Sequence, residues 1–358
     1  MHKILFVGGS SVGHIAPAVA VWSAYQQKHP QTKAHFICTP RLDDAAFLRA
    51  QDLSFTILDA PRLSVLYPLK IRKAIQSARN ILTKIQPDIL CTTGGYLSIP
   101  VCFAAKKMGI PIILHEADSI SGNANKIVSR WATHITEGFP SSHHKQSVLR
   151  THTGNPLRAN ITKGNKKEGL RLTGLSGKKP ILLVVGGSQG SVGINNAVIK
   201  NIDDLLLRTD IIHITGRRKS QVPNLKSQIS PHYYQTEFTH EEIKHFYACS
   251  DIALSRAGTG SIGELSANGI PTVLVPLRGV GHDHQYHNAQ TAVATGGCLY
   301  LEQSTMDTQL VPTIHALVTN KDLRKEMSEK IRTLSHRDAA LHIADIIAQT
   351  LAKGSHDQ

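Results

Sequence analysis

The chain has 358 residues, of which 41% are hydrophobic and 18% charged, and a formal net charge of +14. This composition excludes a largely disordered protein, and the length accommodates two domains of about 100–200 residues each. No apolar run approaches the roughly 18 residues of a membrane span and no signal-peptide pattern is visible, so the chain is expected to stay in the cytosol. The positive charge predicts an acidic partner: a nucleic acid, an anionic membrane or a phosphorylated substrate. Nucleic acid is the weaker choice, because the basic residues are dispersed and aromatic residues make up only 5%.

The cysteines and the 20 histidines show no metal-ligand spacing. The five cysteines lie mostly in apolar stretches and are expected to be buried and reduced; they are Cys38, Cys91, Cys102, Cys249 and Cys298. Two acidic pairs, Asp43-Asp44 and Asp203-Asp204, occur in helix-like contexts rather than on a glycine-flanked loop. The sequence therefore predicts no metal site and no cofactor.

Apolar strand-like runs alternate with helical segments along the whole chain, which predicts parallel sheets covered by helices. In the first half, the expected strands are residues 4–7, 35–38, 55–58, 89–92, 112–115 and 134–136. The expected helices are residues 16–29, 69–85, 98–108 and 123–131.

Residues 165–179 interrupt this pattern, because they are rich in Lys and Gly, and they are interpreted as a linker or surface loop. The alternation then restarts with the apolar run at 181–185. Further strands are expected at residues 211–215, 233–238, 252–255, 272–276 and 299–301. Helices are expected at residues 193–207, 241–248, 260–268, 286–294, 310–318, 321–335 and 339–352.

Two glycine-rich junctions follow apolar strands. The first is Val7-Gly8-Gly9-Ser10-Ser11-Val12-Gly13-His14, and the second is Gly186-Gly187-Ser188-Gln189-Gly190. Glycines let the backbone approach an anion closely, and the following helix points its unpaired N–H groups at it. His14 is an addition that a plain phosphate loop does not need.

Two such starts, about 180 positions apart, indicate two similar nucleotide-type domains facing one another. The predicted division is a first domain over residues 1–157 and a second domain over residues 158–337. The last helix, about 338–353, is assigned to the first domain, although the sequence alone does not decide whether it packs back there.

The densest polar cluster follows the strand expected at 252–255. Gly258 and Thr259 can present N–H groups to a diphosphate at a helix N-terminus. Glu264 lies about one turn into that helix, where a carboxylate can accept hydrogen bonds from ribose hydroxyls. The alternative for Glu264 is a surface glutamate that favours the helix dipole.

A second polar run, Asp283-His284-Gln285 with Asn288, follows the next strand and suits a hydroxyl-rich ligand. For Asp283, a helix N-cap is the alternative. In the first half, Thr93-Gly94-Gly95-Tyr96 and His115-Glu116 also end strands. Since ligands of open parallel sheets bind outside the carboxyl ends of strands, both are expected to line the same crevice as His14. Glu116 has two alternatives, a helix cap and a salt-bridge partner.

Seven segments form one pattern, in order across about 280 residues: Gly8-Gly9…Gly13-His14, Gly94-Gly95-Tyr96, His115-Glu116, Gly154-Asn155-Pro156-Leu157-Arg158, Gly186-Gly187-Ser188-Gln189-Gly190, Arg256-Ala257-Gly258…Glu264 and Asp283-His284-Gln285…Asn288-Ala289. Each is weak alone, and together they are specific. The chain resembles the MurG family, the UDP-N-acetylglucosamine transferases that act on lipid I in peptidoglycan synthesis.

The resemblance implies an α/β fold of GT-B architecture, two Rossmann-like doubly wound parallel-sheet domains with the active site in the cleft. It implies an inverting, metal-independent transfer of N-acetylglucosamine from UDP-N-acetylglucosamine to the muramoyl 4-hydroxyl of lipid I, giving lipid II. The implied location is peripheral, at the cytoplasmic face of the cell membrane, with an undecaprenyl-diphosphate-linked acceptor and an anionic membrane surface as partners.

The same resemblance implies that residues 1–157 form the acceptor and membrane-side domain and that residues 158–337 form the UDP-sugar-binding domain. It also implies roles for individual residues. The implied donor-binding residues are Arg158, Ser188, Gln189, Phe238, Gly258, Thr259, Glu264, His284, Gln285 and Asn288. The implied acceptor-binding residues are Gly8, Gly9, Ser10, Ser11, Gly13, Gly95, Tyr96 and Asn123. The family's first loop usually has the pattern Gly-Gly-Thr-Gly-Gly-His, whereas this loop is one residue longer and has lost a glycine, so Val12 is expected to alter its shape.

An acceptor hydroxyl has a high pKa and requires a base as attack develops. His14 is the candidate, because imidazole titrates near physiological pH, and Glu116 is the reserve. Residues 65–73 mix apolar and basic side chains, as an interfacial patch would, and the alternative is an ordinary helix that buries Leu69 and Ile71. The rival functions are another GT-B UDP-sugar transferase with a different lipid or small acceptor, a UDP-sugar epimerase, and a nucleotide-sugar-binding protein that has lost catalysis.

Overall fold

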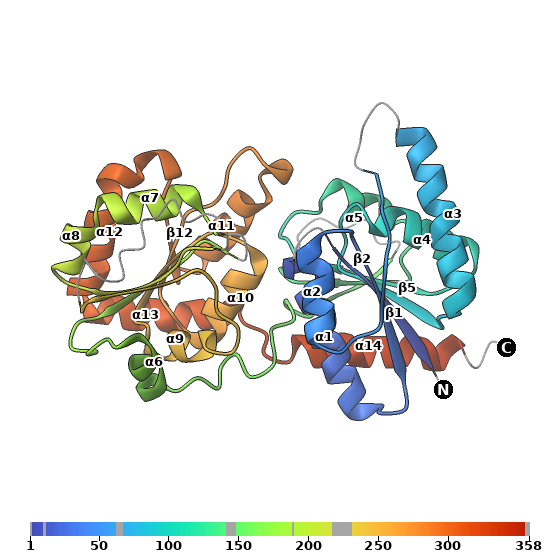
Figure 1. Cartoon of the computed structure of the whole chain (residues 1–358), viewed down its shortest axis with the longest axis horizontal. Helices are drawn as coiled ribbons and strands as arrows, with labels where there is room; N and C mark the ends of the chain where they lie inside the picture. Colours follow the sequence, from blue (N-terminus) through green and yellow to red (C-terminus); the bar gives the residue numbers. More distant parts are fainter. Residues whose placement is uncertain are drawn as a thin grey trace. The chain divides into compact units, whose positions relative to one another are not determined.

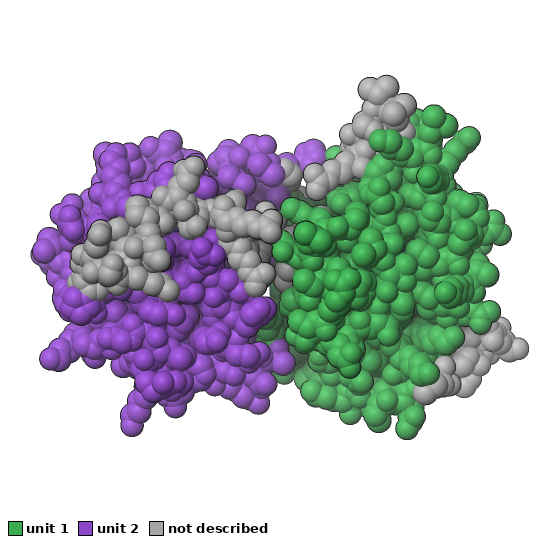
Figure 2. All heavy atoms as spheres, viewed as in Figure 1, with its two compact units in different colours: residues 1–158, 336–358 green, residues 159–335 purple. Residues whose placement is uncertain are grey.

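The computed structural model describes residues 2–9, 12–61, 67–140, 148–187, 190–216 and 231–354. The chain divides into two compact units, which Figure 2 colours separately. Unit 1 comprises Met1–Arg158 and His336–Gln358, and unit 2 comprises Ala159–Ser335. Each unit contains one sheet, and every pairing between the described strands is parallel. The predicted pair of helix-covered parallel sheets is therefore confirmed.

The sheet of unit 1 has seven strands in the order β3-β2-β1-β4-β5-β6-β7. Its strands are β1 (Lys3–Val7), β2 (Lys33–Cys38), β3 (Phe55–Ile57), β4 (Ile89–Thr92), β5 (Ile112–Glu116), β6 (His134–Glu137) and β7 (Leu149–His152). Its helices are α1 (Val12–Lys28), α2 (Leu42–Ala50), α3 (Tyr67–Ile85), α4 (Ser98–Lys107), α5 (Asn123–Val128) and α14 (Ala339–Gly354).

Alternating residues of β1 supply the two cores of unit 1. Ile4 and Phe6 pack with side chains of α1 and α14, whereas Leu5 and Val7 pack with side chains of α3 and α4. Such alternation follows from the two-residue period of a strand, and a sheet covered on both faces needs apolar residues at both positions. The C-terminal helix α14 lies beside α1 in Figure 1 and contributes Ile343 to the core that contains Phe6. The end of the chain is thus part of the unit in which the chain begins.

The sheet of unit 2 has six strands in the order β10-β9-β8-β11-β12-β13. They are β8 (Ile181–Val185), β9 (Asp210–Ile214), β10 (Tyr233–Thr236), β11 (Ile252–Ser255), β12 (Thr272–Leu274) and β13 (Cys298–Tyr300). Its α-helices are α6 (Lys166–Thr173), α7 (Val192–Lys200), α8 (Ile202–Leu206), α9 (Ile243–Cys249), α10 (Thr259–Asn268), α11 (His284–Ala294), α12 (Met306–Thr319) and α13 (Lys321–Ile331). Short 3₁₀ turns are η2 (Gly281–Asp283), η3 (Gln303–Thr305) and η4 (Arg332–Leu334).

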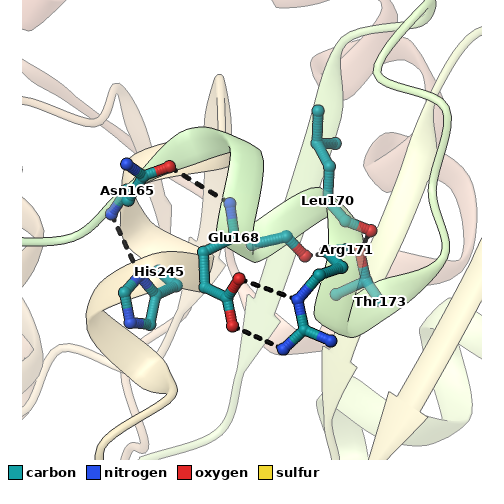
Figure 3. Close-up of polar contacts among 7 residues, drawn as sticks. Asn165, Glu168, Leu170, Arg171, Thr173 and His245 are labelled. Carbon is teal, nitrogen blue, oxygen red and sulfur yellow. Dashed lines mark hydrogen bonds and ion pairs between the residues drawn. The ribbon is translucent and has the colours of Figure 1, made fainter.

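The prediction that residues 165–179 form a linker or loop is wrong, because the segment contains helix α6. Asn165 caps it by accepting a hydrogen bond from the N–H of Glu168 at 3.1 Å, and Arg171 binds both carboxylate oxygens of Glu168 (Figure 3). Gly174 ends the helix in the left-handed conformation. The helix also packs on α9, since a Cβ at Gly169 would lie 2.4 Å from the carbonyl oxygen of His245. Capping and packing outweigh the polar composition that suggested a loop.

Three smaller differences concern a strand and a helix that were not predicted and a helix that is divided in two. Strand β7 was not predicted, because its sequence Leu-Arg-Thr-His is polar at an exposed sheet edge. Helix α2 was not placed, although its Asp43 and Asp44 were recognised as helical. The helix expected at 193–207 is two helices, α7 and α8, with Asn201 between them. All five cysteines are buried and free, as expected. Among the described residues, no helix has the length and apolarity to span a membrane.

Candidate active site

Both sheets reverse their strand order at one position, between β1 and β4 in unit 1 and between β8 and β11 in unit 2. Ligands of open α/β sheets bind outside the carboxyl ends of the strands at such a switch point. The glycine-rich junctions of the sequence follow β1 and β8, and the polar segments at 93–96 and 256–264 follow β4 and β11. In each unit, the candidate site therefore lies at the switch point of the sheet, next to the glycine-rich loops.

In unit 1, Gly8 and Gly9 bring the loop after β1 against its neighbours. A Cβ at Gly8 would lie 2.8 Å from the His14 carbonyl oxygen, and one at Gly9 would lie 2.7 Å from Cγ2 of Thr39. Thr93 donates a hydrogen bond from Oγ1 to that His14 carbonyl at 2.6 Å. Any side chain at these two glycines would separate the loop from the ends of β2 and β4.

The catalytic candidate of this loop lies at the start of α1. Gly13 is exposed, and His14 is half-buried in the first helical turn. Two acceptor-binding predictions, Ser10 and Ser11, lie outside the described residues. The role predicted for His14 stays a prediction.

The loop after β4 has two consecutive glycines with positive φ, Gly94 at +89° and Gly95 at +83°. Such angles are open to glycine at no steric cost. A Cβ at Gly95 would lie 3.8 Å from the carbonyl oxygen of Gly9, so the two glycine loops of unit 1 are neighbours. Tyr96 is half-buried and packs against the core beside α4.

Glu116 ends β5 and is 6% exposed. Burial raises the pKa of Glu116 to about 7, and the charge of Asp118 adds to this rise. Hydrogen bonds from the side chains of Ser121 and Asn125 and from the backbone of Asp118 act in the opposite direction. Its Oε2 atom has no hydrogen-bond partner among the described residues. The carboxyl group therefore has one oxygen without a partner among the described residues and a protonation equilibrium near neutrality.

Helix α5 places its two asparagines differently. Asn123, an acceptor-binding prediction, is exposed at the first helical position, whereas Asn125 is buried. Asn125 packs against Gly94, where a Cβ would lie 2.1 Å from its Oδ1. Sequence reasoning missed Asn125. The available signal was the helical spacing of Asn125 and Val128, which places both on one face.

His115, adjacent to Glu116, has a structural role. Its Nδ1 lies 3.0 Å from Oγ1 of Thr136, and its Nε2 lies 3.0 Å from Oδ1 of Asn155. Asn155 also donates to the carbonyl of Ala117 at 3.0 Å. Burial lowers the pKa of His115 to about 4, so it is neutral at physiological pH. The neutral imidazole fastens the segment that follows Glu116.

In unit 2, the glycines after β8 fit tightly. A Cβ at Gly186 would lie 2.4 Å from the backbone nitrogen of Ser191, and one at Gly190 would lie 2.2 Å from the Thr215 carbonyl oxygen. Ser191 caps α7 by accepting from the N–H of Ile194 at 3.3 Å. Ser188 and Gln189, both donor-binding predictions, lie outside the described residues.

The loop after β11 is open by contrast. A Cβ at Gly258 or at Gly260 would meet no described atom within 4 Å. Gly258 is the N-cap residue of α10 and Thr259 its first residue. The N–H groups at a helix N-terminus attract an anion, and here backbone without a side chain leaves them approachable.

Glu264 is on the buried face of α10, 9% exposed, and accepts a hydrogen bond from the Tyr247 hydroxyl at 2.8 Å. This position excludes the alternative of a merely surface glutamate. Arg256, just before the helix, is also buried and donates to the carbonyl of Val275 at 3.0 Å and to Gln303 at 2.5 Å. The loop after β11 is thus tied to the ends of β12 and β13.

The segment before α11 is internally braced. Gln285 accepts from the N–H of Leu277 at 3.0 Å, and Asp283 accepts from the N–H of Gly279 at 2.5 Å. Asp283 does not cap α11, because its side chain makes no capping hydrogen bond. Its φ of +56° is a strained left-handed conformation for a residue other than glycine. The guanidinium of Arg278 lies 3.5 Å from the Asp283 carboxylate.

The other donor-side predictions lie around this loop and at the unit boundary. Asn288 is fully buried and donates to the Ala257 carbonyl at 3.4 Å, and His284 is half-buried. Phe238 follows β10, and its carbonyl accepts from Oγ1 of Thr236 at 3.1 Å. Arg158 is the last residue of the first segment of unit 1, half-buried, rather than a member of unit 2.

The described residues contain no group of three or more His, Cys, Asp or Glu side chains that could hold a metal ion. The two acidic pairs lie in α2 and α8, as their context predicted. The buried member of the first pair, Asp44, accepts a hydrogen bond from Oγ1 of Thr39.

Comparison with known proteins agrees with this geometry. Residues 4–137 match the glycosyltransferase family 28 N-terminal domain, and residues 181–343 match the glycosyltransferase family 28 C-terminal domain. Two Rossmann-like sheets with glycine loops at their switch points, joined to these matches, define a glycosyltransferase of the GT-B class.

Proteins that match this chain over most of their length identify the family within this class of glycosyltransferases. A UDP-N-acetylglucosamine–N-acetylmuramyl-(pentapeptide) pyrophosphoryl-undecaprenol N-acetylglucosamine transferase of Clostridium botulinum (strain 657 / Type Ba4) is 32% identical over 90% of this chain and 93% of its own length. The protein of that name from Paenarthrobacter aurescens (strain TC1) is 29% identical over 98% and 96%. The crystal structure of Acinetobacter baumannii MurG superposes with a TM-score of 0.76 at 25% identity, covering 97% of this chain and 99% of that one. The chain belongs to the MurG family.

Proposed function

We propose that the chain transfers N-acetylglucosamine from UDP-N-acetylglucosamine to the 4-hydroxyl of the muramoyl unit of lipid I, giving lipid II for peptidoglycan synthesis. The names of its relatives support the donor and the acceptor. The transfer inverts the anomeric carbon in one displacement and needs no metal. In this step the acceptor oxygen bonds to C1, the bond from C1 to the diphosphate oxygen breaks, and UDP leaves with the electron pair.

The observation that carries the mechanism is the state of Glu116. A base must accept the hydroxyl proton during attack, and it works best with a pKa near the operating pH. Glu116 has a pKa of about 7 and one carboxylate oxygen without a partner among the described residues, at the end of the strand next to the β4 glycine loop. We therefore propose that Glu116 is the base and that His14 lies beside the acceptor. The acceptor diphosphate then lies along the backbone of Gly8, Gly9 and Gly95.

Unit 2 supplies most of the donor-binding residues in this proposal. The diphosphate binds the open N-terminus of α10 at Gly258 and Thr259, whose partial positive charge stabilises the leaving UDP without metal. Glu264 accepts hydrogen bonds from the ribose, with its orientation held by Tyr247. The sugar lies beside His284, Gln285 and Asn288, and uracil meets the backbone at Phe238. Arg158, Ser188 and Gln189 complete the nucleotide contacts.

A lipid-linked acceptor requires a membrane-facing surface, and we assign it to the N-terminal part of α3. The helix carries five basic residues and no acidic ones. Leu69 is 70% exposed, contrary to the alternative in which the helix buries it, and Lys70, Arg72 and Lys73 are exposed around it. An exposed apolar side chain among cations fits an anionic lipid surface at the cytoplasmic face of the membrane.

Sedimentation with vesicles tests this surface. Reversing the charge of Lys70 and Lys73 to Glu should reduce binding to anionic vesicles, with Lys325→Glu on α13 of unit 2 as the control. Binding that is equal for both variants, or absent in the wild type, removes the membrane assignment.

Incubation with radiolabelled UDP-N-acetylglucosamine, with and without lipid I, tests the activity. Label that enters lipid only when lipid I is present supports the proposal. Donor consumption without acceptor indicates an epimerase, and donor binding without turnover indicates a binding protein. For the base, Glu116→Gln should lower turnover by about 10²-fold or more. A larger loss in His14→Ala than in Glu116→Gln would return the role to the histidine.

A further inference from the structure

Asn125 has a buried position that stability alone does not explain. The residue is 8% exposed, and its Oδ1 has no hydrogen-bond partner among the described residues. A buried acceptor without a partner costs stability, and an apolar side chain of similar shape, such as leucine, would avoid this cost. Leucine has no hydrogen-bond donor, whereas the asparagine amide has one at Nδ2.

That donor is directed at Glu116. The carboxylate of Glu116 accepts hydrogen bonds from the side chains of Asn125 and Ser121. The Oε2 atom of Glu116 has no partner among the described residues. Hydrogen bonds to a carboxyl group restrict its rotation, and the Oε2 atom stays available to a substrate.

Gly94 packs closely against the amide of Asn125. A Cβ there would lie 2.1 Å from Oδ1 of Asn125 and 2.7 Å from both Cγ and Nδ2. The amide thus occupies the space of the missing side chain, and the φ of +89° at Gly94 adds a second requirement for glycine. We call the loop after β4 (residues 93–96), Asn125 and Glu116 together the Glu116 cluster.

We propose that Asn125 is a positioning residue for the acceptor reaction, which aims the free oxygen of Glu116 and sets the pH range over which that oxygen takes a proton. This inference rests on the proposed role of Glu116 as the base. It predicts a property that a purely structural asparagine would not have, a displaced pH profile.

The direction of the displacement follows from the hydrogen bond. A donor to a carboxylate favours its charged form, so its loss raises the pKa of the carboxyl group. In Asn125→Ala, the acidic limb of the kcat/KM profile should move upward by about one pH unit, since a hydrogen bond to a charged group corresponds to about that shift or more. Asn125→Asp keeps the shape, loses the donor and adds a negative charge, so its shift should be larger.

The experiment compares pH profiles of kcat/KM with lipid I for the wild type, Asn125→Ala, Asn125→Asp, Glu116→Gln and the control Lys126→Ala, an exposed neighbour on α5. We expect the wild-type limb near pH 7, an unshifted control, and Asn125 variants that recover toward wild-type rates at high pH.

The outcomes separate the two proposals. If Glu116→Gln retains activity, the assignment of the base fails. If Glu116→Gln is inactive but both Asn125 variants lose activity equally at every pH, or keep the wild-type profile, only the positioning role fails. Circular dichroism identifies a variant that does not fold, and the isosteric Asn125→Asp then decides.

Discussion

Replacing Glu116 by glutamine is expected to remove a pH dependence from the stability of unit 1. The pKa of Glu116 is raised from 4.5 to about 7 by burial, so the folded chain holds this proton more tightly than the unfolded chain. Between these two values the folded state binds more protons, and stability therefore falls as the pH rises. Below about pH 4.5 the group is protonated in both states and contributes nothing.

The size of this change in stability follows from the pKa shift of Glu116. At about 1.4 kcal/mol per pKa unit, the rise to about 7 corresponds to about 3 kcal/mol of stability lost above pH 7. Glu116 is 6% exposed, so solvent screening does not reduce this figure much. Glutamine is neutral at every pH and avoids the loss. The difference in unfolding free energy, variant minus wild type, should therefore grow by about 3 kcal/mol between pH 4.5 and 8.

Tryptophan fluorescence in urea makes the measurement specific to unit 1. Both tryptophans of the chain, Trp22 and Trp131, lie in that unit. Trp22 is in its core and Trp131 packs edge-on to Phe103 at 5.5 Å. Other titrating groups cancel in the difference between variant and wild type. Asp59→Asn, at an exposed acid of the same unit, is the control and should give a flat difference. A flat difference for Glu116→Gln as well would refute a desolvated carboxyl group.

Three further expectations follow from the two sites. Tyr247→Phe removes the hydrogen bond to Glu264 and should raise the KM for UDP-N-acetylglucosamine about 10-fold, with little change in kcat; a change in kcat alone would contradict the ribose role. Gly94→Ala should lower the urea midpoint of the tryptophan transition far more than Gly109→Ala, because both have positive φ but only Gly94 is in contact with Asn125; equal losses would mean that the contact is soft. Exhaustive treatment with EDTA should leave turnover unchanged, and a loss that Mg²⁺ restores would refute metal-independent transfer.

The positions of the glycine junctions made the architecture predictable. An apolar strand followed by glycines and an amphipathic helix appears at residues 4–28 and again at residues 181–200, and each instance is a strand at the switch point of a parallel sheet. Local signals of this kind lie within one stretch of sequence. Helix α6 was missed although its cap is local, because Lys and Gly outweighed Asn165 and Gly174 in the interpretation.

The Glu116 cluster was not predictable from the sequence in the same way. Gly94 and Asn125 are 31 positions apart, and their contact depends on how α5 returns to the sheet. Asn123 was assigned by the family resemblance, and the spacing of Asn125 and Val128 on the same short helix was not used to ask which asparagine is buried. The elevated pKa of Glu116 is likewise a consequence of burial, which its position at a strand end did not reveal.

The glycines of the two units also separate into kinds that the sequence does not distinguish. Gly8, Gly9, Gly186 and Gly190 are required by packing, since a side chain at any of them would overlap the protein's own atoms. Gly258 and Gly260 have ordinary space around them, so packing gives no reason for their lack of a side chain. The open space at Gly258 and Gly260, at the start of α10, leaves room for a ligand to approach the backbone closely. On this argument, alanine at Gly258 should leave folding intact and weaken donor binding, and the N-terminus of α10 is the point from which the donor site is best mapped.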